Sequence, residues 1–132
     1  VIPMLADAGA HVGIFTDTDS PTFLLSELTR RQGVYSLPEA IRRITQAPAN
    51  VLGLKERGCL KEGWIADLNV FDYDNLETGY PYYANDFPHN GGRFIVESFG
   101  YVATLVSGQV IVENGKHTGQ RPGTVIREFI RG

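Results

Sequence analysis

The chain changes character at Arg57-Gly-Cys-Leu-Lys-Glu-Gly-Trp-Ile-Ala-Asp-Leu-Asn-Val-Phe-Asp72. Before this stretch the apolar residues recur at helical spacing, and after it they alternate or cluster as they do in strands. Within it, Lys61-Glu-Gly63 has the composition of a turn, and Asp67 leads into a short apolar run at residues 68–71. By spacing alone, the sequence predicts a junction between a helical part and a sheet, with a strand at 68–71.

Composition narrows the class of protein. The 132 residues suffice for one domain with a modest core or for part of a larger one. A hydrophobic content of 42% with 20% charged residues is typical of soluble globular proteins. A net charge of −3 predicts no nucleic-acid or anionic-membrane partner, and no apolar run approaches the ~20 residues of a transmembrane helix. Cys59 is the single cysteine, which fits a reducing compartment, so we expect a cytoplasmic protein.

The first residues form a nearly continuous apolar run at 1–6, with no initiator methionine and no signal-peptide pattern. Such a run predicts a strand buried on both faces of a parallel sheet, in a chain cut from something longer. Asp7 follows at the C-terminal end of this strand, where α/β barrels carry their catalytic residues. On the residues alone, Asp7 fits a metal or acid–base site and equally a carboxylate that caps the next turn. His11, as a lone histidine, favours a structural role.

Three helices are predicted before the junction. Ser20 as N-cap and Pro21 at the first helical position predict a helix from about residue 20 to 32, with Gly33 as its C-cap. Ser36-Leu-Pro-Glu39 is a capping box that opens a second helix.

The apolar stripe of the second helix leaves Arg42 and Arg43 pointing outward. We interpret these arginines as a solvated helix face rather than a phosphate-binding patch. A third short helix is expected at residues 48–52, ending at Gly53.

After the junction, residues 76–92 read as a long loop with two prolines and a Gly-Gly pair. A loop of this length is usually functional or covers another part of the molecule. Its aromatics either line a substrate entrance or pack the loop onto the sheet, and we favour packing because aromatic rings carry large apolar area. These aromatics are Tyr80, Tyr82, Tyr83 and Phe87.

The C-terminal part predicts two strands, at residues 101–107 and 110–113, joined by a type II′ turn at Gly108-Gln109. Asn114-Gly115 then predicts a type I′ turn, and residues 124–131 are expected to form a last short helix. His89 and His117 have no partner at metal-ligand spacing. The sequence contains no His-x-x-x-His pair, nucleophile elbow or phosphate loop.

Four segments together resemble the D-aminoacylase branch of the amidohydrolase superfamily, the N-acyl-D-amino-acid deacylase-like enzymes. They follow one another in order from residue 5 to residue 127, so the match extends over essentially the whole chain, and they match the C-terminal third of such enzymes. The segments are Leu5-Ala-Asp-Ala-Gly-Ala-His11, residues 36–54 with Asn50-Val-Leu-Gly-Leu54, the junction at 58–72, and Gly119-Gln-Arg-Pro-Gly-Thr-Val-Ile-Arg127.

The resemblance implies a mixed α and β fold. Residues 1–57 would hold the last strand and helices of a (β/α)8 barrel, and residues 58–132 the C-terminal strands of a small β-sandwich. It also implies that the chain pairs with the remainder of its parent polypeptide or self-associates, since the sandwich and barrel strands would otherwise lack neighbours.

The implied activity is metal-dependent hydrolysis of an N-acyl amide bond in a small molecule such as an N-acyl-D-amino acid. In this family the Asp after the last barrel strand binds or faces the catalytic zinc and acts as general acid/base, and Asp7 inherits both roles. Ala6 departs from the Ser that often precedes this Asp.

Because a catalytic zinc needs about three protein ligands, the chain alone is expected to be inactive. The alternatives are a cyclic-amide or urea-type hydrolase of the same superfamily and a non-catalytic β-rich binding or assembly module.

Overall fold

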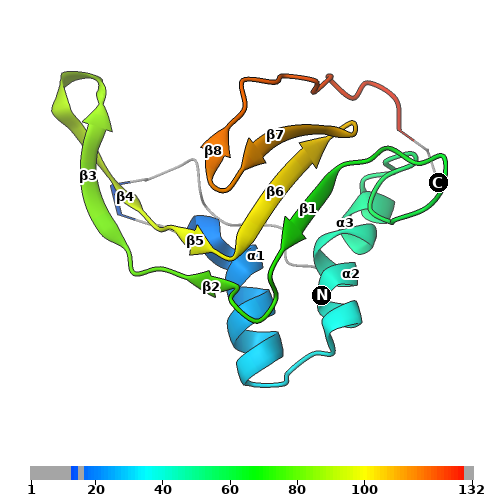
Figure 1. The fold of residues 1–132 in the computed structure, drawn as a ribbon, viewed down its shortest axis with the longest axis horizontal. Coiled ribbons are helices and arrows are strands. Elements are labelled where there is room, and N and C mark those ends of the chain that lie inside the picture. The colour runs from blue at the N-terminus through cyan, green and yellow to red at the C-terminus, as the bar shows by residue number, and fades with distance from the viewer. Residues whose placement is uncertain (1–12, 15–16, 130–132) are drawn as a thin grey trace.

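A computed structural model describes residues 13–14 and 17–129 of the chain (Figure 1). The strand expected at residues 1–6 lies outside the described residues. The fold is mixed α and β, with helices in the first half and antiparallel strands in the second. The assignment of residues 1–57 to a barrel and 58–132 to a sandwich stays a prediction.

The first helix runs without a break through three segments: η1 (Asp17–Asp19), α1 (Ser20–Phe23) and the π-helical η2 (Leu24–Arg31). Ser20 is its first α-helical residue and Asp19 the N-cap, so the prediction of Ser20 as N-cap was wrong by one position. The wider π spacing is visible near the end, where the Gln32 N–H donates to the Glu27 carbonyl at 3.0 Å. Gly33, with φ of 66°, ends the helix as predicted, although the C-cap itself is Gln32.

The second helix, α2 (Leu37–Ile44), has Ser36 at its N-cap as predicted. The capping box does not form, because Ser36 makes no side-chain cap bond and Glu39 pairs with two arginines instead. Arg42 binds Glu39 with two hydrogen bonds of 2.8 and 3.0 Å and points outward as predicted. The prediction for Arg43 was wrong, because its half-buried guanidinium lies 4.7 Å from the centre of the Tyr35 ring.

A third helix, α3 (Gln46–Val51), begins two residues earlier than predicted and is followed by Gly53 with φ of 65°. The junction then passes close to its start. A Cβ placed on Gly58 would lie 2.8 Å from the Ala49 Cβ and 3.0 Å from the Thr45 carbonyl oxygen. Only glycine allows this approach together with a φ of +85°.

A four-stranded antiparallel sheet follows, in the order β1-β6-β7-β8. The strand predicted at 68–71 is confirmed as β1, and Asn114-Gly115 forms the predicted turn with φ of 47° and 75°. The type II′ turn at Gly108-Gln109 was wrong. The two turn residues are Ser107 and Gly108, both with positive φ, and Gln109 already pairs with Val106. The strands are β1 (Leu68–Phe71), β6 (Tyr101–Val106), β7 (Gln109–Glu113) and β8 (Lys116–His117).

The loop predicted at 76–92 was also wrong, because most of it is paired β-structure. Strand β2 pairs with β5, and β3 pairs with β4 around a short 3₁₀ turn, η3 (Pro88–Asn90). We call residues 77–99 the arm, and Figure 1 shows it projecting away from the four-stranded sheet. Its strands are β2 (Glu77–Thr78), β3 (Tyr82–Phe87), β4 (Gly91–Ile95) and β5 (Ser98–Phe99).

The strand pairs nest, since β1 pairs with β6, β2 with β5 and β3 with β4. Residues 68–106 therefore form one long antiparallel ribbon whose open end is part of the sheet and whose closed end is η3. Gly100 lies at the bend between β5 and β6 with φ of +88°.

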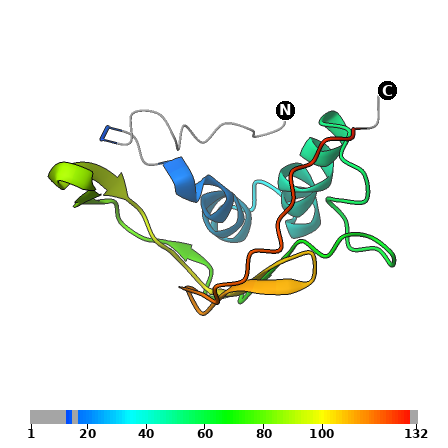
Figure 2. The ribbon, with the colours of Figure 1, turned by 90° about the horizontal axis from the view of Figure 1, so that it is seen from above.

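The core lies between the helices and one face of the sheet, and Figure 2 shows the helices on that side. Leu24, Leu25, Ala40 and Leu76 are buried there, and the rings of Phe71 and Tyr101 pack against them. The two rings meet edge to face with centroids 6.0 Å apart. The result is two layers, helices over sheet, built around apolar side chains from both halves of the sequence.

The last described segment does not form the helix expected at 124–131, because residues 124–129 are neither helix nor strand. This segment runs from the sheet back toward α3 (Figure 2). None of the helices in the described part of the chain has the length and apolar character required to cross a membrane.

Candidate active-site region

The two residues singled out at the start of the chain, Asp7 and His11, lie outside the described residues. Of the other histidines, His89 lies in the arm's closed end with φ of 59°, and His117 lies on the exposed strand β8. In residues 13–14 and 17–129, no three His, Cys, Asp or Glu side chains come together as a metal ion would require. The described residues therefore do not fit a metal centre by themselves.

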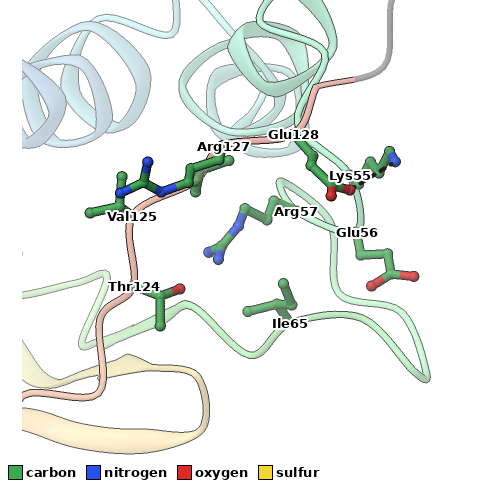
Figure 3. Close-up of a pocket in the computed structure, with 9 residues that line it drawn as sticks. Lys55, Glu56, Arg57, Ile65, Thr124, Val125, Arg127 and Glu128 are labelled. Carbon is green, nitrogen blue, oxygen red and sulfur yellow. Dashed lines mark ion pairs between the residues drawn. The ribbon is translucent and has the colours of Figure 1, made fainter.

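A cavity of about 360 Å³ opens between the junction and the C-terminal segment (Figure 3). Figure 3 shows Arg57 reaching into the space between Ile65 and Thr124. The lining residues are Lys55, Glu56, Arg57, Ile65, Thr124, Val125, Ile126, Arg127 and Glu128.

Ion pairs stabilise the walls of this cavity. Arg57 pairs with Asp67, whose other carboxylate oxygen accepts the Ser107 N–H at 2.9 Å, so the junction is linked to the sheet. Lys55 lies 3.7 Å from Glu128, which links the residues just before the junction to the C-terminal segment. The lining residues include no histidine, cysteine or serine. The cavity lies where ion pairs connect neighbouring segments of the chain, and its lining residues do not favour a catalytic site.

The arm lies beside Gly13, six positions after Asp7 in the sequence. A Cβ placed on Gly13 would lie 3.9 Å from the carbonyl oxygen of Gly92 in β4. The first turn of α1 contacts the same ribbon, because the Thr22 hydroxyl donates to Ser98 Oγ at 3.0 Å and lies 2.9 Å from the Tyr101 hydroxyl. The ribbon thus contacts the chain on both sides of Asp17–Asp19.

The four aromatics named in the prediction are exposed, so the interpretation that they pack a loop onto the sheet was wrong. Tyr80 is 94% exposed and Tyr83 54% exposed, and Tyr82 and Phe87 also face solvent. Tyr83 lies edge to face with Phe94 across the β3–β4 pair, with centroids 5.1 Å apart. Apolar rings that stay at the surface are available to bind a ligand or another surface.

The β3–β4 hairpin is held by a charged pair on its surface. Arg93 donates two hydrogen bonds to Asp86, at 2.9 and 2.6 Å, and its guanidinium lies 5.1 Å from the centre of the Phe87 ring. The hydrogen bond from Arg93 is the main reason that the pKa of Asp86 is lowered, and the same pair raises the pKa of Arg93. Both groups are therefore charged at neutral pH, and their planar two-bond geometry fixes the relative position of β3 and β4.

Sequence reasoning missed the arm, although a signal for it is present. Asn90-Gly91 is one of the favoured hairpin dipeptides, and it lies between two segments rich in aromatic residues. The chain turns one residue earlier than this dipeptide predicts, at His89 and Asn90 with φ of 59° and 61°. The two prolines, Pro81 and Pro88, favour a loop in a simple reading. Both occupy positions that a ribbon tolerates, since Pro81 precedes β3 and Pro88 opens η3.

Comparison with known proteins identifies the relatives of this chain. Residues 2–112 match the model of the amidohydrolase family. An N-acyl-D-aspartate deacylase from Alcaligenes xylosoxydans xylosoxydans is 32% identical over 105 residues, which are 80% of this chain and 19% of that protein. A dihydroorotase from Endomicrobium trichonymphae is 33% identical over 94 residues, covering 68% of this chain and 21% of the relative.

Among solved structures, a D-aminoacylase mutant in complex with CuCl2 superposes with a TM-score of 0.66. It is 28% identical, and the match covers 82% of this chain and 21% of that one. The chain therefore spans about a fifth of the length of the relatives that it matches. Since the family match takes in the arm, the sheet and the helices alike, the chain belongs to the amidohydrolase family and resembles its D-aminoacylase-like members.

Proposed function

We propose that the complete enzyme carrying this chain hydrolyses a carbon–nitrogen bond, namely the N-acyl amide of a D-amino acid or a related small molecule. The observation that carries the proposal is the family match at residues 2–112, which includes Asp7. It is supported by the similarity to an N-acyl-D-aspartate deacylase and to the fold of a D-aminoacylase.

Asp7 is the residue to which we assign the proton transfers of this reaction. Its carboxylate would accept a proton from the attacking water and deliver it to the nitrogen of the departing amine as the C–N bond breaks. A carboxylate at the end of a strand is held in a fixed position, and proton transfer requires hydrogen-bond distance to the reacting atoms.

A metal ion, which we propose to be zinc, belongs to this function, because the D-aminoacylase structure that this chain resembles is a complex with CuCl2. The described residues of this chain do not fit a complete metal site. Asp7 is the one residue of the chain that we propose as a metal ligand. Since a catalytic zinc needs about three protein ligands, the others would come from the remainder of the complete enzyme.

The test of Asp7 is an Asp7→Asn variant of the complete enzyme. Asn has nearly the same shape but takes up no proton, so we expect kcat to fall by about 10²–10⁴-fold. Hydrolysis of N-acetyl-D-amino acids measures the loss, and elemental analysis of the purified variant shows whether metal content has changed. Near-normal turnover in an Asp7→Asn enzyme with a full metal complement would remove Asp7 from the mechanism.

A second candidate is the hydrolysis of a cyclic amide, which is favoured by the relatives named dihydroorotase. Assays of the wild-type enzyme on N-acetyl-D-amino acids and on dihydroorotate separate the two activities directly. If only dihydroorotate is consumed, the N-acyl amide proposal is wrong and the cyclic-amide reaction replaces it.

A further inference from the structure

The dipeptide Asn-Gly occurs twice in the sequence, at Asn90-Gly91 and at Asn114-Gly115. Asparagine is a chemically labile residue, because the backbone nitrogen of the next residue can attack its side-chain amide. A glycine in that next position has no Cβ, so its nitrogen is the least shielded that a chain can offer. Both dipeptides carry the same reacting groups, and the fold decides which of them is open to reaction.

At Asn114-Gly115 the reacting groups are free. The two residues form the exposed turn between β7 and β8, with φ of 47° and 75°. Within the described part of the chain, neither the Asn114 side-chain amide nor the Gly115 N–H has a hydrogen-bond partner. A Cβ added to Gly115 would have no atom within 4 Å, so the space beside this residue is open. The turn therefore presents an unprotected amide next to an unprotected nitrogen.

At Asn90-Gly91 the attacking nitrogen is already bound. The Gly91 N–H donates to the Pro88 carbonyl oxygen, and Gly91 is paired with Phe87 at the closed end of the arm. A Cβ added to Gly91 would lie 3.2 Å from the Phe87 Cβ and 3.4 Å from the Pro88 oxygen. Attack on Asn90 requires that this hydrogen bond open first. The same dipeptide is thus protected in the arm and unprotected in the sheet.

We propose that Asn114 is a site of spontaneous deamidation, at which the folded protein forms aspartate and isoaspartate. The Gly115 nitrogen gives up its proton to a base in the solvent and attacks Cγ of Asn114. The new C–N bond closes a succinimide ring, the Cγ–Nδ2 bond breaks, and the amide nitrogen takes up a proton and leaves as ammonia. The reaction involves no oxidation or reduction and does not depend on what the enzyme hydrolyses.

Water then opens the succinimide ring at one of its two carbonyl groups. If the newly formed C–N bond breaks, residue 114 becomes an ordinary aspartate. If the original peptide bond breaks instead, the main chain runs through the side-chain methylene and the product is isoaspartate. In both cases the net reaction consumes one water, releases one ammonia and leaves a carboxylate in place of the Asn114 amide.

Isoaspartate changes the turn because it adds an atom to the main chain. A two-residue turn fits its strands only with the backbone of two ordinary residues. The pairing at stake is that of β7 with β8, which includes Glu113 with Lys116. Just beyond it, the Thr118 N–H donates to the Ile111 carbonyl oxygen at 3.0 Å. We therefore expect the isoaspartyl form to release β8 from the edge of the sheet.

The experiment incubates the complete, folded enzyme at mildly alkaline pH, where the amide nitrogen loses its proton more readily. Peptide mass spectrometry over several weeks measures deamidation at Asn114 and at Asn90. We expect Asn114 to react about 10-fold faster, because one backbone hydrogen bond must open before Gly91 can react. A protein isoaspartyl methyltransferase with S-adenosylmethionine labels the isoaspartyl product and separates it from aspartate.

The same protein unfolded in urea is the matched control, because both dipeptides are then equally exposed. The two sites should react there at the same rate. Asn114→Gln should show no modification at residue 114 and an unchanged rate at Asn90, because the longer side chain does not close a five-membered ring. Asn114→Asp carries the new charge without the added backbone atom. Its Thr118 amide should stay protected from hydrogen exchange, whereas that of the isoaspartyl form should exchange faster.

The outcome that supports the proposal is selective reaction at Asn114 in the folded enzyme and loss of that selectivity in urea. An unmodified Asn114 in the folded enzyme would overturn it. Reaction at Asn90 that equals or exceeds that at Asn114 in the folded enzyme would overturn it as well, because the fold would then not select the site.

Discussion

The four-stranded sheet and the arm belong to one ribbon, yet they are held in different ways. The sheet rests on α1, η2 and α2, and side chains such as Leu76 and Leu25 are buried between the two layers. In the arm, β3 pairs only with β4 among the described strands, and Tyr82, Tyr83 and Phe87 face solvent. An isolated two-stranded hairpin is marginally stable in water, so the arm needs stabilising side-chain pairs between its own strands, which the sheet does not.

Three such side-chain contacts are present in the hairpin. The Asp86–Arg93 pair, the Arg93–Phe87 contact and the Tyr83–Phe94 pair all join β3 to β4. The base of the ribbon is thus stabilised by buried apolar side chains, and its tip is stabilised by side-chain pairs across the two strands. Each of the following predictions changes one of these two kinds of support.

The largest effect is expected at Leu76, which is fully buried at the base of the arm. Leu76→Ala should lower the free energy of unfolding by about 2–5 kcal/mol, because it removes buried methyl groups and leaves a cavity. Urea denaturation followed by circular dichroism measures the change. Leu60→Ala is the control, since Leu60 is 85% exposed and its truncation should cost less than about 0.5 kcal/mol. Equal effects of the two substitutions would mean that Leu76 is not part of the core.

A smaller effect is expected at Gly100, the bend between the arm and the sheet. An added Cβ would lie 2.8 Å from both the Leu76 Cα and the Asn75 carbonyl oxygen, which are backbone atoms that cannot rotate away. Gly115 has a similar φ of +75° with no atom within 4 Å of the added Cβ. We expect Gly100→Ala to destabilise by about 1–3 kcal/mol more than Gly115→Ala, in thermal unfolding of the two variants. An equal loss of stability in Gly100→Ala and Gly115→Ala would show that the positive φ alone makes glycine necessary at the bend.

The smallest effect concerns the tip of the arm and its response to acid. Hydrogen bonding from Arg93 lowers the pKa of Asp86, so the paired hairpin binds fewer protons than the unpaired one. The support is complete above the ordinary pKa of an aspartate, about 3.9, and is lost as the pH falls through the lower value of the paired state. NMR spectra between about pH 6 and pH 3 should show loss of hairpin signals before those of the sheet.

Asp86→Asn tests the assignment of this acid response. The variant removes the titrating group, so its hairpin should be weakened already at pH 6 and should change little between pH 6 and pH 3. The sheet signals should be those of the wild type throughout. An identical acid response in the wild type and in Asp86→Asn would show that another group controls the hairpin.

Much of the fold was predictable where local sequence and tertiary structure agree. Strand β1 was found with its bounds, because the alternation in Leu68–Phe71 is bordered by polar residues on both sides. The turn at Asn114-Gly115 was found because both residues readily adopt positive φ. The helix that includes α1 was found because Pro21 and Gly33 mark its two ends.

The errors share a physical cause, which is competition from partners that are distant or not obvious in the sequence. Glu39 fits a capping box, but two arginines on the following turn provide stronger charged partners. Ser107 adopts φ of 49° because pairing between Val106 and Gln109 sets the register. The exposed aromatics of the arm resemble core residues in composition, and the sequence alone does not say which side of a ribbon will be covered.

The candidate site was also predictable only in part. The role of Asp7 follows from its place after an apolar run and from family resemblance, and it stays a prediction. The contact between Gly13 and Gly92 was not foreseen, because it joins residues that are far apart in the sequence.

The nested strand pairs also bear on the order in which the chain folds. Asp86 and Arg93 at the tip are 7 positions apart, whereas Asn69 and Thr104 in the sheet are 35 positions apart. Each doubling of the length of a closed loop costs about 0.6 kcal/mol of chain entropy. The cost of loop closure is therefore lowest when strand pairing starts next to η3 and proceeds toward the sheet. Pairing at the tip would then set the register in which β1 meets β6. An insertion of one residue in either strand of the arm would shift β6 against β1 by one position unless a bulge absorbs it, and that shift exchanges the buried and exposed faces of the strand.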